Sequence, residues 1–336
     1  MGQTLVIAEK PSVAGDIARA LGGFKKDGDF WVSDAMIVGS AVGHLLEIKA
    51  PEEYDVKRGR WSFANLPVLP PHFDLQPIKK SIKKFEGLEK KIRSRSVTDI
   101  INACDAGREG ELIFRYIIQA TGTKKPIRRL WLQSMTKTSI QKAFTALRSD
   151  AEMKPLEAAA RSRSEADWLV GINGTRALTA FNSKDGGFFL TTVGRVQTPT
   201  LAIVVAREEE IAHFKPQNYW EVHATFGAQA GDYDSVWVDA DFKKTKGQSA
   251  ELKPERLWTA AEAQAIVAKC QGKLGIVTDH KRRATSAPPA LFDLTSLQRE
   301  ANGRFGFPAK MTLAILQRLY ERHKVLTYPR TDSRAL

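Results

Sequence analysis

The stretch LVIAEKPS, residues 5–12, decides the fold of the N-terminal part of the chain. Its first half is apolar and β-branched, which favours a short buried strand. Pro11 suits the first turn of a helix, and VAGDIARAL (13–21) has apolar residues at helical spacing. The stretch therefore predicts a strand, a turn and a helix, with Glu9 and Lys10 at the end of the strand.

The same alternation of strands and helices continues to about residue 150. The expected elements are a strand at 35–42, a non-periodic loop at 51–77, a basic helix at 79–95, a buried strand at 97–105 and an amphipathic helix at 107–121. Such alternation predicts an α/β domain with a mainly parallel, Rossmann-like sheet.

The rest of the chain has a different pattern. Residues 151–212 are nearly all helical in spacing, and residues 218–240 alternate with period two, which indicates a hairpin or small sheet. Further expected elements are a helix at 259–271, a strand at 274–283, and helices at 292–305 and 308–323.

Acidic residues follow two of the expected strands. Glu9 comes directly after the first, and Asp105 and Glu109 follow the strand at 97–105. Ligands of open parallel sheets gather outside the carboxyl ends of strands, and carboxylate oxygens suit Mg²⁺. The alternative is that these are solvated acids at helix starts. His44 lies near the same rim, where a structural role is the favoured interpretation.

LVIAEKPS and ACDAGREGELI (103–113) resemble the Toprim domain, in which a glutamate and an acidic D-x-D-type motif support phosphoryl transfer with Mg²⁺. The resemblance implies that Glu9, Asp105 and Glu109 hold Mg²⁺. Gly107 stands where many Toprim proteins have a second aspartate, and whether Glu111 replaces it stays open.

The second chemical motif is TYPRTDS, residues 327–333. A tyrosine can store the energy of a broken phosphodiester as a phosphotyrosine ester, and Arg330 can clamp phosphate oxygens. A lone tyrosine is more often a packed aromatic, but the whole string resembles the active-site signature of type IA DNA topoisomerases. That resemblance implies that Tyr328 attacks single-stranded DNA and is linked to its 5′ phosphate. Lys10 would neutralise the scissile phosphate, and Glu9 would protonate the leaving 3′ oxygen.

The helical segment carries the third motif. ARSRSEADWLVGINGTRAL (160–178) and TVGRVQTP (192–199) resemble the single-strand-binding domain of the same family. Arginine and glutamine supply phosphate and base-edge contacts, and Trp168 can stack on a base. The alternative is a buried Trp168 with the arginines in surface ion pairs. The DNA-binding residues that the resemblance implies are Arg161, Arg163, Asp167, Arg195, Gln197 and Thr198.

Composition agrees with a nucleic-acid partner. Lys and Arg exceed Asp and Glu by 51 to 38, a net charge of +13. Two cysteines offer neither a disulfide framework nor zinc spacing, and no apolar run approaches the ~20 residues of a membrane span. We expect a soluble protein of the cytoplasm, associated with the nucleoid and not with a membrane.

The resemblance to a topoisomerase III-like enzyme covers nearly the whole chain and implies four parts. They are the Toprim domain (1–150), a helical single-strand DNA-binding domain (151–215), part of a β-rich arch (216–280) and the start of the domain that carries the tyrosine (281–336). Members of the family run on for hundreds of residues, so we expect a C-terminally truncated chain.

The expected activity is ATP-independent cleavage of one DNA strand, strand passage and religation, with Mg²⁺ as cofactor. No G-x-x-x-x-G-K-[ST] loop occurs in the sequence, which agrees with that expectation. The expected substrates are single-stranded and negatively supercoiled or catenated DNA, with a helicase as a possible partner. The alternatives are a catalytically incompetent fragment that binds single strands, and a Toprim nuclease or primase.

Overall fold

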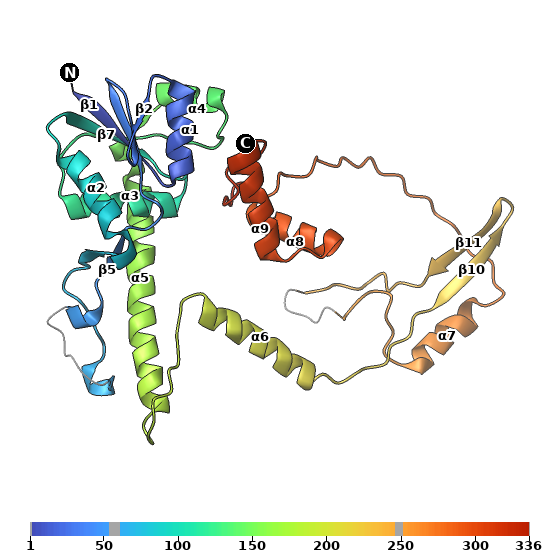
Figure 1. The fold of residues 1–336 in the computed structure, drawn as a ribbon. Coiled ribbons are helices and arrows are strands. Elements are labelled where there is room, and N and C mark those ends of the chain that lie inside the picture. The colour runs from blue at the N-terminus through green and yellow to red at the C-terminus, as the bar shows by residue number, and fades with distance from the viewer. Residues whose placement is uncertain (1, 54–60, 246–250, 336) are drawn as a thin grey trace. The chain divides into compact units, whose positions relative to one another are not determined.

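The chain forms two compact units in a computed structural model that describes residues 2–53, 61–245 and 251–335 (Figure 1). The first unit combines residues 1–200 with 289–336, and the second holds residues 201–288. Within the described ranges, no helix has both the length and the apolar character needed to cross a membrane.

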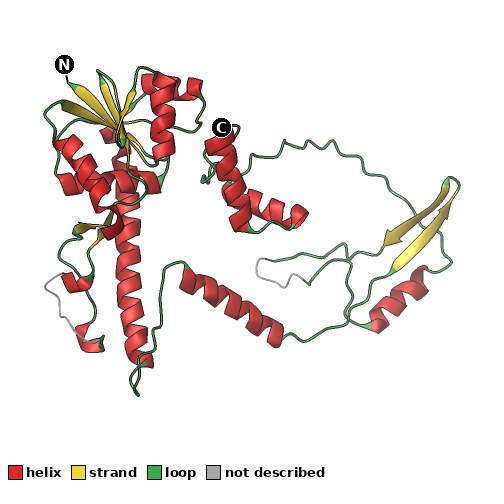
Figure 2. Ribbon diagram, viewed as in Figure 1, coloured by secondary structure: helices red, strands yellow, loops and turns green. Residues whose placement is uncertain are grey.

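A seven-stranded sheet forms the centre of the first unit (Figure 2). Its strands, in spatial order, are β2 (Lys25–Asp27), β3 (Phe30–Val32), β4 (Met36–Ser40), β1 (Gln3–Ala8), β7 (Val97–Ala103), β8 (Ile127–Arg129) and β9 (Arg148–Ser149). The four central strands, β4, β1, β7 and β8, run parallel, and the pairs at both edges are antiparallel. This confirms the predicted mainly parallel α/β sheet, whose short antiparallel edges the sequence did not indicate.

Helices cover both faces of this sheet, because the central strands are apolar on both sides. Leu5 and Ile7 of β1 point into a core formed with α2 (Ile82–Arg93) and α3 (Arg108–Thr121). Val6 and Ala8 point into the opposite core, with α1 (Pro11–Leu21) and α4 (Lys137–Thr145). Residues 5–8 are all fully buried.

The longest helix of the first unit, α5 (Asp150–Asn182), begins at a capping box between Ser149 and Glu152. Its N-terminal half packs on α3, and Ala160 belongs to the core between them. Its C-terminal half binds part of the loop expected at 51–77, since the Asn173 amide donates to the carbonyl of Val68 at 3.0 Å. Residues 54–60 of that loop lie outside the described residues.

Short elements connect these helices and strands. A small antiparallel sheet pairs β5 (Leu46–Ile48) with β6 (Leu75–Pro77). The 3₁₀ turns are η1 (Pro51–Glu53), η2 (Phe63–Asn65) and η3 (Lys79–Ser81).

Residues 319–333, here called the tyrosine segment, follow α8 (Leu294–Phe305) and α9 (Ala309–Arg318). The segment begins with a π-helical turn, η4 (Leu319–His323), and returns to the sheet. Lys324 ends that turn with a φ of 56°, in the left-handed region. Its ammonium then pairs with the buried Asp16 of α1 at 2.8 Å. Tyr320 is buried in the core on the α1 side of the sheet. These contacts fix the segment against α1 and the sheet.

The second unit contains the expected hairpin, β10 (His223–Ala228) with β11 (Gly231–Val236), and the helix α7 (Ala260–Cys270). Helix α6 (Gln197–Ala212) runs from the first unit's residues into those of the second. The strand expected at 274–283 is wrong. Leu274 and Ile276 are fully exposed, and no strand among the described residues pairs with them. Alternation of apolar residues favours a strand only where a neighbour supplies hydrogen bonds.

Gly110 gives a test of how closely α3 must approach the end of β7. A Cβ at Gly110 would lie 2.2 Å from the backbone oxygen of Asp105, whereas none of the described atoms lies within 4 Å of a Cβ at Gly87 of α2. We predict that Gly110→Ala lowers the free energy of unfolding by about 1–3 kcal/mol through overpacking. Gly87→Ala should be neutral or stabilising by up to about 1 kcal/mol. Thermal unfolding measures both, and equal melting midpoints for the two variants would contradict the close approach.

Candidate active site

The parallel register brings two carboxylates to one rim of the sheet. Ala8 pairs with Ala103, so Glu9 and Asp105 leave the carboxyl ends of adjacent strands. Both line a cavity of about 320 Å³, together with Lys10, Gln317, Tyr328 and Arg330. The structure therefore gathers the sequence-predicted Glu9, Lys10, Asp105, Tyr328 and Arg330 around one space.

Tyr328 is held at this rim by its backbone and its ring. Its N–H donates to the carbonyl of Gln133 at 2.8 Å, and its ring meets Tyr320 edge to face with centroids 5.7 Å apart. Burial raises the pKa of Tyr328, and the negative charges of Asp105 and Glu9 and a hydrogen bond to Asp105 raise it further, against the opposing charge of Arg330. The phenol is thus held neutral until positive charge offsets the two carboxylates.

Burial raises the pKa of Glu9 above its ordinary value, and the charge of Asp105 adds to the effect. Lys10 opposes this shift. A carboxyl group that keeps its proton to higher pH is suited to protonate a leaving oxygen.

Lys10 bridges the sheet and the tyrosine segment. Its Nζ lies 3.6 Å from the carboxylate of Asp105 and donates to Glu321 at 2.8 Å. Burial lowers the pKa of Lys10, but the bond to Glu321 and the charge of Asp105 raise it by more. The ammonium therefore stays charged between the two carboxylates.

The acidic residues at the rim fit a cation only in part. Oε2 of Glu9 is buried and has no hydrogen-bond partner among the described residues, and it lies beside the Asp105 charge. Glu109 instead bonds to His44 at 2.5 Å, and that bond lowers the pKa of Glu109. No three acidic, histidine or cysteine side chains of the described residues converge on one point. Mg²⁺ needs only one or two protein carboxylates when it keeps water and substrate phosphate as ligands, so Glu9 and Asp105 suffice in number.

Glu111 does not replace the missing aspartate of the rim. Its carboxylate is fully buried, accepts from Arg115 at 2.7 Å and from Asn102 at 3.0 Å, and lies 3.3 Å from Arg129. Arg115 also pairs with Asp150 of α5 at 2.6 Å. The group ties α3 to β7, β8 and α5, and its oxygens face these partners.

Arg129 positions the backbone that carries Asp105. Its buried guanidinium donates to the carbonyls of Cys104 and Asp105, each at 2.7 Å. It also donates to the carbonyls of Asn102 and Leu130, each at 3.0 Å. One side chain from β8 thus fixes the turn after β7.

Of the six DNA-binding residues predicted from the sequence, Arg163 lines the cavity that contains Glu9, and the other five lie outside the lining of that cavity. Arg163 of α5 lines the cavity with Glu9 and also a second one of about 210 Å³ that Asp167 lines. Arg161 lies 3.6 Å from Glu157 on the same helix. Asp167 forms an ion pair with Arg195, and Thr198 accepts from the N–H of Gly194 at 3.1 Å. Gln197 begins α6.

Trp168 has a structural contact. Its indole nitrogen donates to the carbonyl of Lys49 at 3.2 Å, and its ring meets Phe73 edge to face. This geometry corresponds to the packed alternative and not to a free stacking surface.

Gln317 and Glu321 were not predicted from the sequence, and His44 was expected to be structural. Gln317 and Glu321 are four residues apart at the end of α9 and in the π-helical turn, and both face the rim. No local pattern indicated them, because the chain leaves the helical conformation between these residues and Tyr328. Nothing in the local sequence pairs His44 with Glu109, because that contact depends on the tertiary fold.

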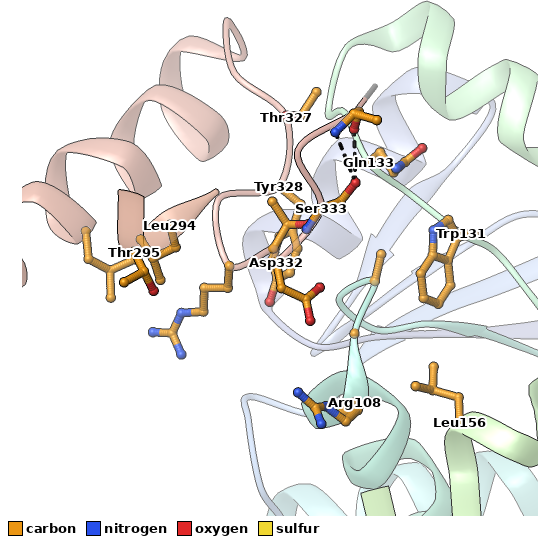
Figure 3. Close-up of a pocket in the computed structure, with 16 residues that line it drawn as sticks. Arg108, Trp131, Gln133, Leu156, Leu294, Thr295, Thr327, Tyr328, Asp332 and Ser333 are labelled. Carbon is orange, nitrogen blue, oxygen red and sulfur yellow. Dashed lines mark hydrogen bonds between the residues drawn. The ribbon is translucent and has the colours of Figure 1, made fainter. Parts of the chain in front are cut away.

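A larger cavity of about 830 Å³ adjoins Tyr328 (Figure 3). Trp131 and Gln133 line one side, Leu294 and Thr295 line the other, and Asp332 lies between them with Tyr328. Its walls come from the loop after β8, from α8 and from the tyrosine segment.

Comparisons with known proteins agree with this arrangement. Residues 151–336 match the protein family described as DNA topoisomerase, and residues 4–135 match the Toprim domain. The chain is 42% identical to DNA topoisomerase 3 of Bacillus subtilis (strain 168) over 338 residues, which cover 100% of the chain and 44% of that protein. It is 43% identical to DNA topoisomerase 3 of Bacillus cereus (strain ATCC 14579), covering 99% of the chain and 43% of that protein.

The fold is similar to that of full-length topoisomerase I from Thermotoga maritima. The TM-score is 0.62 at 24% identity, over 98% of this chain and 49% of that one. The chain thus spans less than half the length of the curated relatives described above.

Because the pKa of Glu9 is raised in the folded protein, the stability of the fold should depend on pH. A carboxyl group with a raised pKa in the folded state stabilises the fold while it is protonated, and this contribution is lost as pH rises through the raised pKa. Glu9→Gln, which is always neutral, should therefore melt higher than the unchanged chain at pH 7–8. The difference should disappear as the pH falls below the ordinary glutamate value of 4.5.

Melting midpoints from circular dichroism over a pH series measure this difference. Glu86→Gln, at an exposed site on α2, is the matched control. A Glu9→Gln variant that is less stable at pH 7–8 than at pH 4, relative to the unchanged chain, contradicts the assignment.

Proposed function

The chain belongs to the DNA topoisomerase family, and we propose that it cleaves one DNA strand through a transient phosphotyrosine link at Tyr328 and reseals it. The observation that carries this proposal is that Tyr328 lines one cavity with Glu9, Lys10, Asp105 and Arg330. A nucleophile, a proton acceptor, a proton donor and two cations line one space.

Each side chain then has a role that its surroundings support. Tyr328 loses its proton to Asp105 and attacks the phosphorus, while the bond to the 3′ oxygen breaks and that oxygen leaves with a proton from Glu9. Lys10 and Arg330 offset the negative charge that develops on the phosphate oxygens. Religation is the reverse, in which the 3′ hydroxyl attacks the phosphotyrosine and Glu9 takes the proton back. No nucleotide hydrolysis is needed, because the ester bond stores the energy.

We propose Mg²⁺ as the cofactor, held by Glu9 and Asp105, with Glu109 as an outer ligand once it leaves His44. The unpartnered Oε2 of Glu9 beside the Asp105 charge supports this site. The ion would supply positive charge next to the scissile phosphate. Arg163, Asp167 and Arg195, with Arg161, Gln197 and Thr198 along α5 and the start of α6, would guide the single strand to the rim.

The wider activity rests on the same proposal. Strand passage, relaxation of negatively supercoiled DNA and decatenation would require the whole protein, in which the four parts at 1–150, 151–215, 216–280 and 281–336 act together. DNA as the proposed substrate supports a location in the cytoplasm at the nucleoid. A helicase partner remains a proposal from family resemblance.

The nucleophile can be tested by trapping the covalent complex. With a single-stranded oligonucleotide and Mg²⁺, denaturing gels should show a protein–DNA adduct for the unchanged chain and none for Tyr328→Phe. Tyr320→Phe is the matched control, since Tyr320 contacts the Tyr328 ring but is buried in the core. It should keep an adduct within about fivefold of the unchanged chain, because only a hydroxyl is removed. An adduct that persists in Tyr328→Phe would assign the nucleophile to another residue, and cleavage that persists in Tyr328→Phe without an adduct would support a Toprim nuclease or primase instead.

Gly107 provides a test of the metal site. Its backbone is extended, with a φ of −173°, and a Cβ there would make ordinary contact with the Tyr328 ring at 3.9 Å. Gly107→Asp can therefore add a carboxylate to the rim without strain. We predict that it tightens Mg²⁺ binding roughly five- to tenfold, because affinity follows the number of charged ligands.

Gly107→Asn, of the same shape but neutral, is the control and should not tighten binding. Calorimetric titration of Mg²⁺ reads binding directly, and the Mg²⁺ dependence of adduct formation reads it through activity. Equal Mg²⁺ affinities for the Asp and Asn variants would place the metal away from this rim.

A further inference from the structure

Three adjoining cavities trace a path across the rim of the sheet. The cavity of Asp167 and the cavity of Glu9 share Arg108, Glu109 and Arg163. The cavity of Glu9 and the larger cavity of Figure 3 share Gly107, Arg108, Tyr328 and Arg330. The tyrosine therefore lies at the junction of two spaces, and the proposed function uses only one of them.

The chemistry of the proposed function assigns a direction to this path. In an in-line displacement the attacking and leaving oxygens lie on opposite sides of the phosphorus. Glu9, the proton donor to the leaving 3′ oxygen, lines only the smaller cavity. The leaving 3′ oxygen then lies in the smaller cavity, and the larger cavity is the adjoining space open to the nucleotide that keeps the phosphate and becomes attached to Tyr328.

The charged residues that line the larger cavity differ along its length. One end favours a phosphate group, and the rest favours an uncharged group. Its two cations, Arg108 and Arg330, lie at the junction with the smaller cavity. The one further charged residue in its lining is Asp332, whose carboxylate repels a phosphate. A phosphate is favoured at the junction, and an uncharged group is favoured beyond it.

The far part of the cavity suits a flat, largely apolar group with a polar edge. Trp131 is half-buried and fixed by the guanidinium groups of Arg148 and Arg129, at 4.5 and 5.0 Å from its ring centroid. Leu156 and Leu313 add apolar surface, and Gln133 and Thr295 add hydrogen-bonding groups. Figure 3 shows Trp131 and Gln133 on the same wall. A volume of about 830 Å³ lies within the ordinary range for ligand sites.

We infer that this cavity is a nucleobase subsite for the +1 nucleotide, the one whose 5′ phosphate is transferred to Tyr328. The inference rests on the proposed function. Trp131 and Gln133 contact the base, and the subsite holds the cleaved end in place for religation.

Adduct formation with modified oligonucleotides tests the subsite. Once the cleavage position is mapped, an abasic residue at +1 should lower adduct yield in the unchanged chain at least about fivefold, the lower limit for loss of one base contact. The same abasic residue at +3 should change the yield less than twofold. In Trp131→Leu and Gln133→Ala, the penalty for the abasic residue at +1 should shrink to below about twofold.

Gln119→Ala is the matched control for Gln133→Ala. Both glutamines have exposed side chains and backbone carbonyls that accept a hydrogen bond, but Gln119 lies on α3 and lines neither cavity. It should keep the full abasic penalty. An unchanged penalty in both Trp131→Leu and Gln133→Ala, or no penalty in the unchanged chain, overturns the subsite while leaving the proposed function intact.

Photo-crosslinking tests the subsite without cleavage. The Tyr328→Phe chain is irradiated with oligonucleotides that carry 5-iodo-2′-deoxyuridine at each position in turn, and the crosslinked peptide is identified by mass spectrometry. One position should crosslink to the peptide that contains Trp131, and it should be +1 in the oligonucleotide that the unchanged chain cleaves. A complete scan without a crosslink to that peptide overturns the inference. A Trp131 crosslink without any adduct from the unchanged chain would overturn the proposed function and, with it, the +1 assignment, and would leave a base-binding cavity that serves no cleavage.

Discussion

The parallel pairing of β1 with β7 is the constraint on which the site depends. Because Ala8 lies opposite Ala103, the residues that follow the two strands leave the sheet at the same level. Both strands are buried on both faces, so a shift of register would expose apolar side chains and is opposed by the whole core. Arg129 then fixes the turn of Asp105 through carbonyl contacts. These contacts hold the two strand ends at the rim in place.

The charged residues at this rim affect the pKa of the Tyr328 hydroxyl. Two carboxylates beside a buried phenol hold the Tyr328 proton in place, since both raise its pKa. A phosphodiester adds further negative charge, so proton loss depends on opposing positive charge such as that of Arg330. This arrangement would link activation of the proposed nucleophile to the presence of a complete site. The Lys10–Glu321 hydrogen bond joins the sheet to the tyrosine segment and contributes to the same balance of positive and negative charge at the rim.

Much of this could be predicted from the sequence, because strand ends and helix starts follow local patterns. The strand before Glu9, the strand before Asp105 and the helix after it were expected and are present as β1, β7 and α3. That Tyr328 belongs beside them came only from family resemblance, since no local rule brings together residues so far apart in the chain.

The roles of Glu109 and Glu111 depended on tertiary contacts. Two residues apart on a helix, they face different directions, and only Glu111 meets the buried arginines. No local pattern distinguishes the buried Arg129 from an exposed arginine at a strand end, and the strand expected at 274–283 has no partner strand among the described residues.

The polarity of the covalent link tests the central claim most directly. An oligonucleotide that carries distinct labels at its two ends is cleaved, and the trapped adduct is digested to a peptide. The proposed link predicts that the label from the 3′ end stays attached, through a 5′ phosphate on Tyr328, and that the label from the 5′ end is released. Retention of the 5′-end label, or attachment to any other residue, would contradict it.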